Sequence, residues 1–383
     1  MALHEAGHLR NGDTATHILR FPAELVEMVA QELTPSDFRA FRSTCNQVNN
    51  YSYPTFATQN FEDKEFSLAH APSMQALVDI SQHAVFGKKL KDVALSLDIV
   101  LDSKWTADYR GNKSEGTIAA AIVAREKIAA RQRVYLQSLQ WRWPLLVALQ
   151  NLRRFAGSKG FRIAFGVNTR WHRDSIGICG EADIERGLGE IEHSYLEAFG
   201  SLASGFFQTL FQARCPIREL IAGSSSLALK TQELDHSSIY SKEDFDAVFG
   251  RMRSLRLFCT DEDYDNTEKP PPYSPGVVRA LLMVPNLEKL HVQVERWGHA
   301  GQASFMSSLM STIHFGHIRQ LRLDAVYLDS DETLAFLRRH KSTLESVDIV
   351  DHEHEWPDDG DELEEEIRLA LPGVELFYDT YYD

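Results

Sequence analysis

Two histidine-rich segments contain residue types that could perform metal chemistry. Residues 4–8 read His-Glu-Ala-Gly-His, a spacing with which a helix can hold zinc between two histidines while a glutamate activates water. That chemistry requires a stable helix, a third ligand and an enclosing cleft, but Gly7 lies inside this copy and Gly12 follows it. We therefore interpret residues 1–16 as a flexible tail, because chain ends are poorly ordered unless contacts hold them.

The second segment, residues 352–355, reads His-Glu-His-Glu. Because no second group of ligands accompanies it, this alternation is typical of a polar loop, and we predict no metal site. The sequence also lacks a glycine-rich phosphate loop, a Gly-x-Ser-x-Gly segment and a cysteine–histidine pair in a context typical of a nucleophile. We therefore expect no catalytic residues, no cofactor and no enzyme activity in this chain.

The composition is typical of a globular protein, with 43% hydrophobic and 25% charged residues. A net charge of -15 disfavours nucleic acid as the main ligand, because phosphate binding needs a concentrated lysine and arginine surface. The longest apolar runs are far shorter than the roughly 20 residues that cross a bilayer. We expect no membrane association and a cytoplasmic or nuclear location. The cysteines are widely separated, which indicates reduced thiols: Cys45, Cys179, Cys215 and Cys259.

Two amphipathic helices are predicted within residues 17–60. Pro22 suits the first turn of a helix, and apolar residues follow it at helical spacing. Residues 34–37, Thr-Pro-Ser-Asp, end that helix and cap a second one. Helices this short cannot form a sizeable core alone, so we expect their apolar surface to need a partner. The apolar positions are Leu25, Met28, Val29 and Leu33 in the first helix, and Phe38, Phe41, Cys45 and Val48 in the second.

This segment resembles an F-box, the part of a ubiquitin-ligase substrate receptor that binds the Skp adaptor. The resemblance rests on Phe21-Pro22, on Glu24-Leu25, on residues 33–38 (Leu-Thr-Pro-Ser-Asp-Phe) and on Phe41-Arg42, Thr44-Cys45 and Val48. It covers about a tenth of the chain, and Phe21 stands where Leu-Pro is commonest. The resemblance implies an adaptor-binding surface made by Phe21, Pro22, Leu25, Val29, Leu33, Pro35, Phe38, Phe41 and Val48.

A repeated pattern occupies residues 217–383, with apolar side chains at its first, fourth and sixth positions. Helical signals fill the gaps between copies, so each unit is predicted to be a helix followed by a strand. Such units stack because none can bury its apolar face alone. The copies are Ile217/Leu220/Ala222, Met252/Leu255/Leu257, Leu287/Leu290/Val292, Ile318/Leu321/Leu323, Leu344/Val347/Ile349 and Leu371/Val374/Leu376.

The repeats resemble the degenerate leucine-rich repeats that follow F-boxes, particularly in fungal proteins. The asparagine or cysteine expected after each strand is absent from this sequence. The fold class that we predict is α/β: an F-box-like helical hairpin over residues 17–60, followed by an irregular leucine-rich-repeat-like solenoid over residues 61–383. Additional strands and helices are expected before residue 217, among them a strand over residues 90–97 and a helix over residues 117–140.

The residue between the fourth and sixth positions of each repeat should point to the open face of the sheet, because side chains alternate along a strand. This row runs from basic to acidic, and we hypothesise that it lines a groove for an extended or charged protein segment. Residues 261–273 are a second candidate for contact with such a segment. The row consists of Ile221, Arg256, His291, Arg322, Asp348 and Glu375.

Three functions are consistent with these patterns. The first is a substrate-recognition subunit that binds the Skp adaptor, and through it a cullin ligase, while its repeats bind an unknown protein target. The second is an interaction scaffold whose F-box-like hairpin packs internally and recruits no ligase. The third is a zinc hydrolase, which depends entirely on residues 4–8. The first hypothesis accounts for both the helical segment and the repeats.

Overall fold

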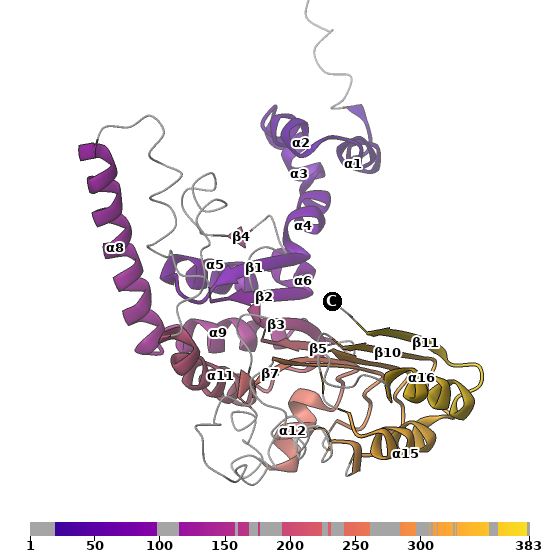
Figure 1. The fold of residues 1–383 in the computed structure, drawn as a ribbon. Helices are drawn as coiled ribbons and strands as arrows, with labels where there is room; N and C mark the ends of the chain where they lie inside the picture. Colours follow the sequence, from indigo (N-terminus) through magenta and orange to yellow (C-terminus); the bar gives the residue numbers. More distant parts are fainter. Residues whose placement is uncertain are drawn as a thin grey trace, which may run out of the picture. The chain divides into compact units, whose positions relative to one another are not determined.

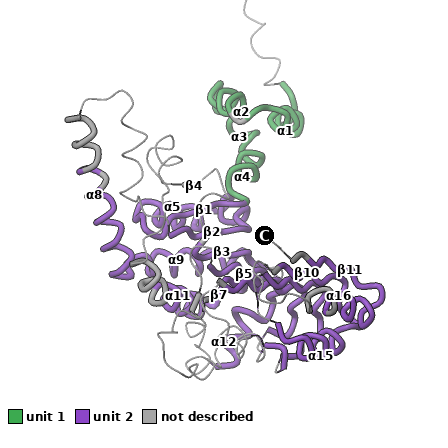
Figure 2. The backbone as a smooth tube through the Cα atoms, in the orientation of Figure 1, with its two compact units in different colours: residues 1–62 green, residues 63–383 purple. Residues whose placement is uncertain are grey.

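The chain forms two compact units in the computed structural model, Met1–Glu62 (unit 1) and Asp63–Asp383 (unit 2) (Figure 2). The expected boundary at 60/61 lies two residues from this division. The expected tail and the segments 4–8, 261–273 and 352–355 lie outside the described residues. The structure describes residues 20–97, 115–157, 160–167, 175–176, 194–223, 229–230, 241–260, 284–295, 306, 309–311, 313–324, 326, 328–351 and 359–380.

Unit 1 contains helices α1 (Ala23–Gln31), α2 (Pro35–Arg42), α3 (Asn46–Tyr51) and α4 (Tyr53–Phe61). The predicted cap of α2 is confirmed, since the Thr34 side chain accepts a hydrogen bond from the backbone N–H of Asp37 at 3.2 Å.

The prediction of one continuous helix after Thr34 was wrong. The sequence from Phe38 to Val48 is divided between α2 and α3, because Cys45 adopts extended backbone angles between them. Its Sγ accepts a hydrogen bond from the backbone N–H of Val48 at 3.5 Å, which caps α3. Cys45 is therefore a capping residue and not a member of one apolar stripe.

The interior of unit 1 is built mainly from small residues and a few aromatic rings. Arg42 lies over the Phe56 ring, with 3.5 Å between its guanidinium carbon and the ring centroid. Burial lowers the pKa of Arg42 from its ordinary value, but the guanidinium remains charged at any physiological pH. This cation–π contact fixes α4 against α2. The buried apolar side chains are Val26, Ala30, Phe38, Val48 and Ala57.

Unit 2 is an α/β unit with one open sheet, whose order in the described residues is β11-β10-β9-β8-β7-β5-β3-β2-β1-β4, with β6 beside β7 (Figure 1). Every described pairing between neighbouring strands is parallel. The strands are β1 (Asp63–Ser67), β2 (Asp92–Ser96), β3 (Phe161–Val167), β4 (Ser175–Ile176), β5 (Ile217–Ala222), β6 (Leu229–Lys230), β7 (Ser254–Thr260), β8 (Lys289–Glu295), β9 (Gln320–Asp324), β10 (Ser346–Asp351) and β11 (Glu375–Thr380).

Described helices lie between β1 and β2, β2 and β3, β4 and β5, β6 and β7, β9 and β10, and β10 and β11, in keeping with the long crossovers that parallel pairing requires. Helix α5 packs against α9, α9 against α11 and α11 against α12, and α15 packs against α16. In Figure 1, α12, α15 and α16 lie along the same side of the C-terminal strands. The helices are α5 (Ala71–Gln82), α6 (Phe86–Lys89), α8 (Glu115–Gln137), α9 (Arg142–Arg153), α11 (Ser194–Ala213), α12 (Lys242–Phe249), α15 (Ser330–His340) and α16 (Asp359–Ala370).

One face of the sheet carries the apolar side chains of the core. On this face, Leu220, Leu255, Leu290, Leu321 and Val347 form a buried row in register across β5, β7, β8, β9 and β10. Helix α11 covers the continuation of this face, where the rings of Phe165 on β3 and Phe206 stack with centroids 4.3 Å apart. The fourth and sixth positions of the predicted repeats therefore build the core between sheet and helices.

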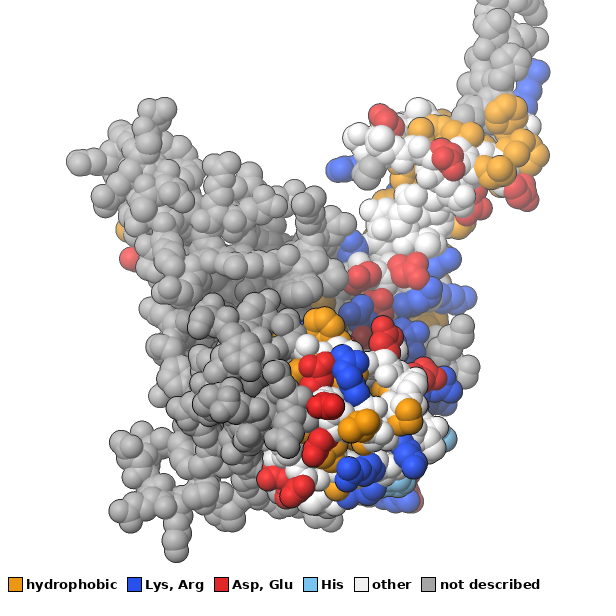
Figure 3. Space-filling model, turned by 45° about the vertical axis from the view of Figure 1, so that its right-hand side comes forward, with side chains coloured by type: hydrophobic (Ala, Val, Ile, Leu, Met, Phe, Trp, Pro, Cys, Tyr) orange, Lys and Arg blue, Asp and Glu red, His pale blue; other side chains and the backbone are white. Residues whose placement is uncertain are grey.

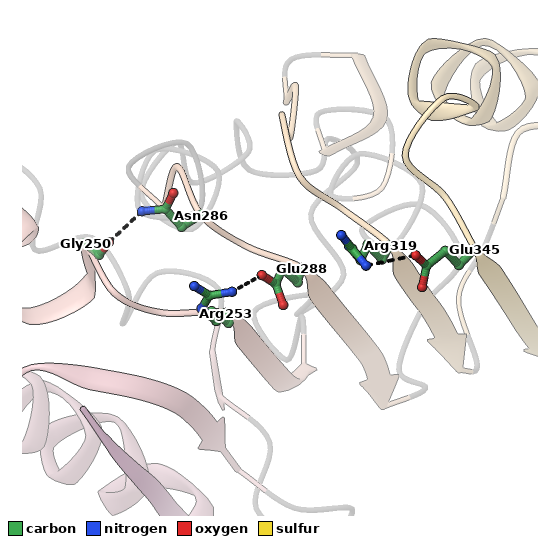
Figure 4. A network of polar contacts seen from close by, with 6 residues as sticks. All are labelled: Gly250, Arg253, Asn286, Glu288, Arg319 and Glu345. Atoms are coloured by element: carbon green, nitrogen blue, oxygen red, sulfur yellow. Dashed lines mark hydrogen bonds and ion pairs between the residues drawn. The ribbon is translucent and has the colours of Figure 1, made fainter. Parts of the chain in front are cut away.

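Polar contacts that recur from strand to strand join the amino-terminal ends of β7 to β10 (Figure 4). The backbone N–H of Glu288 donates to the carbonyl of Arg253 at 2.8 Å, and the N–H of Arg319 donates to Glu288 in the same way. Side chains at these positions pair between neighbouring strands, Arg253 with Glu288 and Arg319 with Glu345. Asn286 Nδ2 also donates to the carbonyl of Gly250 at 2.8 Å. These contacts fix the register of β7 to β10.

Candidate protein-binding surfaces

Helix α1 presents an apolar surface in unit 1, and Figure 3 shows hydrophobic side chains gathered there. The side chains are Phe21, Leu25, Met28 and Val29, with exposed fractions of 43%, 43%, 59% and 39%. Val26 and Ala30 on the opposite side of the helix are buried. The helix is therefore apolar on both sides, but the interior of unit 1 covers only the side with the smaller residues. We call the exposed group the α1 surface.

The structure divides the predicted adaptor-binding residues into two sets. Pro22 is exposed beside the α1 surface, and Leu33 and Phe41 are half-buried. Phe38 and Val48 are only 2% and 1% exposed, so they belong to the interior of unit 1 and stabilise it. We therefore correct the expectation that these two contact a partner. Pro35 occupies the first turn of α2, where its missing N–H costs nothing.

The predicted row on the open face of the sheet is present from β5 to β10. Ile221, Arg256, His291, Arg322 and Asp348 are consecutive partners in the strand register. Since side chains alternate along a strand, all five point away from the buried leucine row.

The sixth member of that row was predicted wrongly. The partner of Asp348 on β11 is Phe377, whereas Glu375 pairs with Ser346, two residues earlier. Leu376 occupies the fourth position of its repeat and not the sixth, because the chain between α16 and β11 is longer than the pattern implied. Gly373 lies in this connection with φ of 93°, a left-handed conformation that glycine adopts without strain. The row therefore ends on an aromatic side chain that is 52% exposed, and not on a second acidic one.

Asp324, which the sequence pattern missed, organises the centre of this face. Its Oδ2 lies 2.7 Å from His291 Nε2 on the neighbouring strand, and Arg322 Nε lies 2.9 Å from its Oδ1. The Asp324 side chain is only 6% exposed, whereas that of Arg322 is 45% exposed. Alternation along β9 would have placed Asp324 on the same face as Arg322, so the signal was present in the sequence.

Burial and charge determine the protonation states of this group. Burial raises the pKa of Asp324, but hydrogen bonds from His291 and Arg322 outweigh it and leave the pKa below its ordinary value. Burial lowers the pKa of His291, and nearby Arg256 and Arg322 lower it further against the opposing effect of Asp324. Asp324 is therefore a carboxylate and His291 a neutral imidazole at pH 7, with Nε2–H donating to Asp324.

Arg256 is the other well-defined cation of this face. Its guanidinium carbon lies 4.6 Å from the centroid of the Phe258 ring, which is buried beside it. Arg256 Nε is buried and has no hydrogen-bond partner among the described residues. Lys289, two residues before His291 on β8, is exposed on the same face. We call Arg256, Lys289 and Arg322 the cationic cluster.

The described residues place no catalytic arrangement on either surface. They contain no group of three or more metal-ligating side chains that could hold an ion. No helix in the described part of the chain combines the length and apolar character that crossing a membrane requires. Comparison of the chain with models of known protein families and with curated proteins gives no match. The fold defines an α/β protein with an open parallel sheet, and its two candidate sites are surfaces suited to binding.

Proposed function

We propose that this chain is a substrate-recognition subunit of a Skp-cullin-F-box ubiquitin ligase. In this proposal the α1 surface binds the Skp adaptor, the open face of the unit 2 sheet binds a protein target, and a separate enzyme transfers ubiquitin. The single observation that carries the proposal is the exposed apolar side of α1 in a helical unit that precedes an α/β unit. Isolated apolar patches of this kind mark interaction sites more often than chance exposure.

The resemblance of residues 21–48 to an F-box supplies the identity of the partner. The repeat-like strands of unit 2 support the role of a target-binding domain, since an open sheet face presents side chains from several strands at once. Catalysis in such an assembly is proximity, because the scaffold holds the target near the transferring enzyme.

The test is recovery of the adaptor and cullin with tagged full-length chain from cells. The variant Leu25→Asp plus Val29→Asp places two charges on the α1 surface and should reduce recovery at least tenfold, about 1.4 kcal/mol or more of binding free energy. Leu369→Asp is the matched control, because Leu369 on α16 is 76% exposed and lies in unit 2. It should leave recovery unchanged.

Failure of the wild-type chain to recover the adaptor would favour the alternative, a scaffold that recruits no ligase. Equal recovery by the wild type and by the α1 variant would show that the adaptor binds elsewhere. Each variant should show the same cooperative unfolding transition as the wild type, since both substitutions replace exposed side chains.

A further inference from the structure

We propose that the cationic cluster binds the carboxylate groups of an acidic, extended protein segment. This inference rests on the proposed function for the biological role of that segment as a ligase target, but the binding itself requires no adaptor. The cluster lies on three adjacent strands, β7, β8 and β9, because Arg256, His291 and Arg322 are register partners. Neighbouring strands are about 4.8 Å apart, so two guanidinium groups flank one imidazole over about 10 Å.

The charges at the centre of this face favour an anionic ligand. Among the described side chains of β7 to β9, Arg256, Lys289 and Arg322 contribute three positive charges and Asp324 contributes one negative charge, which leaves +2 (3 − 1) with His291 neutral. The negative charges of Glu219, Asp348 and Glu375 lie on the flanking strands β5, β10 and β11. Asp324 is buried and already accepts bonds from His291 and Arg322, so it offers little to a ligand. A positive centre of this kind is unusual on a chain whose formal net charge is -15.

The described residues compensate the charge of Arg256 incompletely. Its Nε is buried and lacks an acceptor among the described residues, and a buried charged donor without an acceptor is costly. The ring of Phe258 holds the guanidinium from its face and offers no hydrogen-bond acceptor. A carboxylate is planar and accepts two parallel N–H bonds from one guanidinium, which makes it a suitable ligand.

The other residues of the row through Arg256, His291 and Arg322 indicate that the ligand is a protein segment and not a small molecule. Phe377 lies beyond Asp348 on one side of the cluster, and Ile221 lies beyond Arg256 on the other. Ala164 on β3 and Ala94 on β2 continue the row but are buried, so Ile221 is its last accessible apolar member on that side. A chain that crosses the strands would therefore contact apolar residues on both sides of a cationic centre. This arrangement suits an acidic segment flanked by apolar residues.

The test is fluorescence anisotropy with the purified full chain and two labelled peptides, one rich in glutamate and flanked by leucine, the other with glutamine in place of glutamate. We expect the glutamate peptide to bind at least tenfold more tightly, with an affinity that decreases as salt concentration rises. Arg256→Gln plus Arg322→Gln should weaken this binding by tenfold or more, since charge-assisted hydrogen bonds contribute about that much each.

Arg253→Gln plus Arg319→Gln is the matched control, because it removes the same charge from the ends of two of these strands, β7 and β9. It should bind the glutamate peptide as the wild type does. If the double glutamine variant of the cluster does not fold, Arg256→Lys plus Arg322→Lys retains the charges but loses the paired geometry, and it should bind measurably more weakly.

Equal affinity for the two peptides, or equal weakening by the cluster and control variants, would overturn the inference. Displacement of the glutamate peptide by inorganic phosphate at the concentration of the peptide itself would also overturn it, because the cluster would then be a general anion site. None of these measurements includes the adaptor, so their failure is distinguishable from failure of the ligase proposal.

Discussion

Unit 1 leaves apolar side chains of α1 exposed, whereas unit 2 buries those of its strands beneath a layer of helices. Leu25 and Leu290 illustrate the contrast, since the first is 43% exposed and the second 1%. Unit 1 has one small interior that already holds Val26 and Ala30, and none of the helices that the structure describes between residues 20 and 62 covers the other side of α1. The same apolar spacing in a sequence can therefore indicate two structures. Where other elements cover the apolar side chains, they form a core, and where none does, they form a candidate binding surface.

The largest difference between the two units should appear when a leucine is truncated in each. Leu290→Ala removes a side chain from the buried row of the sheet and should reduce the free energy of unfolding by about 2–5 kcal/mol. Leu25→Ala should change it by about 0.5 kcal/mol or less, because the side chain makes few contacts within the chain. Chemical denaturation of the full-length variants measures both values. A comparable loss from Leu25→Ala would show that α1 packs against the rest of the chain.

An intermediate effect on stability should come from substitution of His340, which is buried in unit 2. Its Nε2 accepts a hydrogen bond from the backbone N–H of Phe315 at 3.0 Å, and its Nδ1–H donates to the carbonyl of Phe336 at 2.8 Å. Burial lowers the pKa of His340, and the nearby charges of His314 and Arg339 lower it further despite the opposing bond to Phe336. The folded chain therefore holds this imidazole neutral where the unfolded chain would protonate it.

The expected pH dependence follows from that difference in pKa. Above the unfolded-state pKa of about 6.5 the stability contribution is fully present. As pH falls from there toward the folded-state pKa, the unfolded chain binds more protons and stability decreases. Thermal unfolding across this range should show a shallower slope for His340→Gln than for the wild type. An unchanged slope would mean that His340 is solvated or already protonated in the folded chain. His291, whose pKa is also lowered, contributes to the slope equally in the wild type and the variant, so the difference between the two slopes reports on His340.

The smallest effect on the free energy of unfolding should come from breaking the charged pairs at the strand ends. Arg319 and Glu345 are 59% and 58% exposed, so water and salt screen their attraction. Arg319→Gln should lower the free energy of unfolding by at most about 1 kcal/mol, and less in high salt. A larger, salt-independent loss would show that register in unit 2 depends on side-chain pairs more than on the backbone hydrogen bonds beside them.

Strands β5, β7, β8, β9 and β10 were predictable because their apolar residues recur with the alternation that a half-covered strand requires. Strand β1 was not, since residues 63–67 read Asp-Lys-Glu-Phe-Ser and Lys64 and Glu65 are nonetheless buried. When tertiary contacts bury polar residues, the sequence shows no apolar periodicity from which a strand could be predicted. The break at Cys45 was missed for a related reason, because a cysteine can either cap a helix or lie within an apolar stripe.

The candidate surfaces were predictable to different degrees. Leu25 and Val29 were identified from their spacing, but the same spacing could not show that Phe38 and Val48 face the interior. Arg256 and Arg322 were identified by strand alternation, which a correct register preserves. Glu375 was misplaced because the register of β11 depends on the length of the turn through Gly373, and sequence periodicity does not determine that length.

Direct binding of the purified adaptor to the purified full-length chain tests the proposed function most simply. Isothermal titration calorimetry should give a one-to-one complex for the wild type and for Leu369→Asp. It should show binding at least tenfold weaker for Leu25→Asp plus Val29→Asp. A wild-type chain that unfolds cooperatively but gives no binding heat, and no co-elution with the adaptor on size exclusion, would contradict the proposal that the α1 surface recruits a ligase.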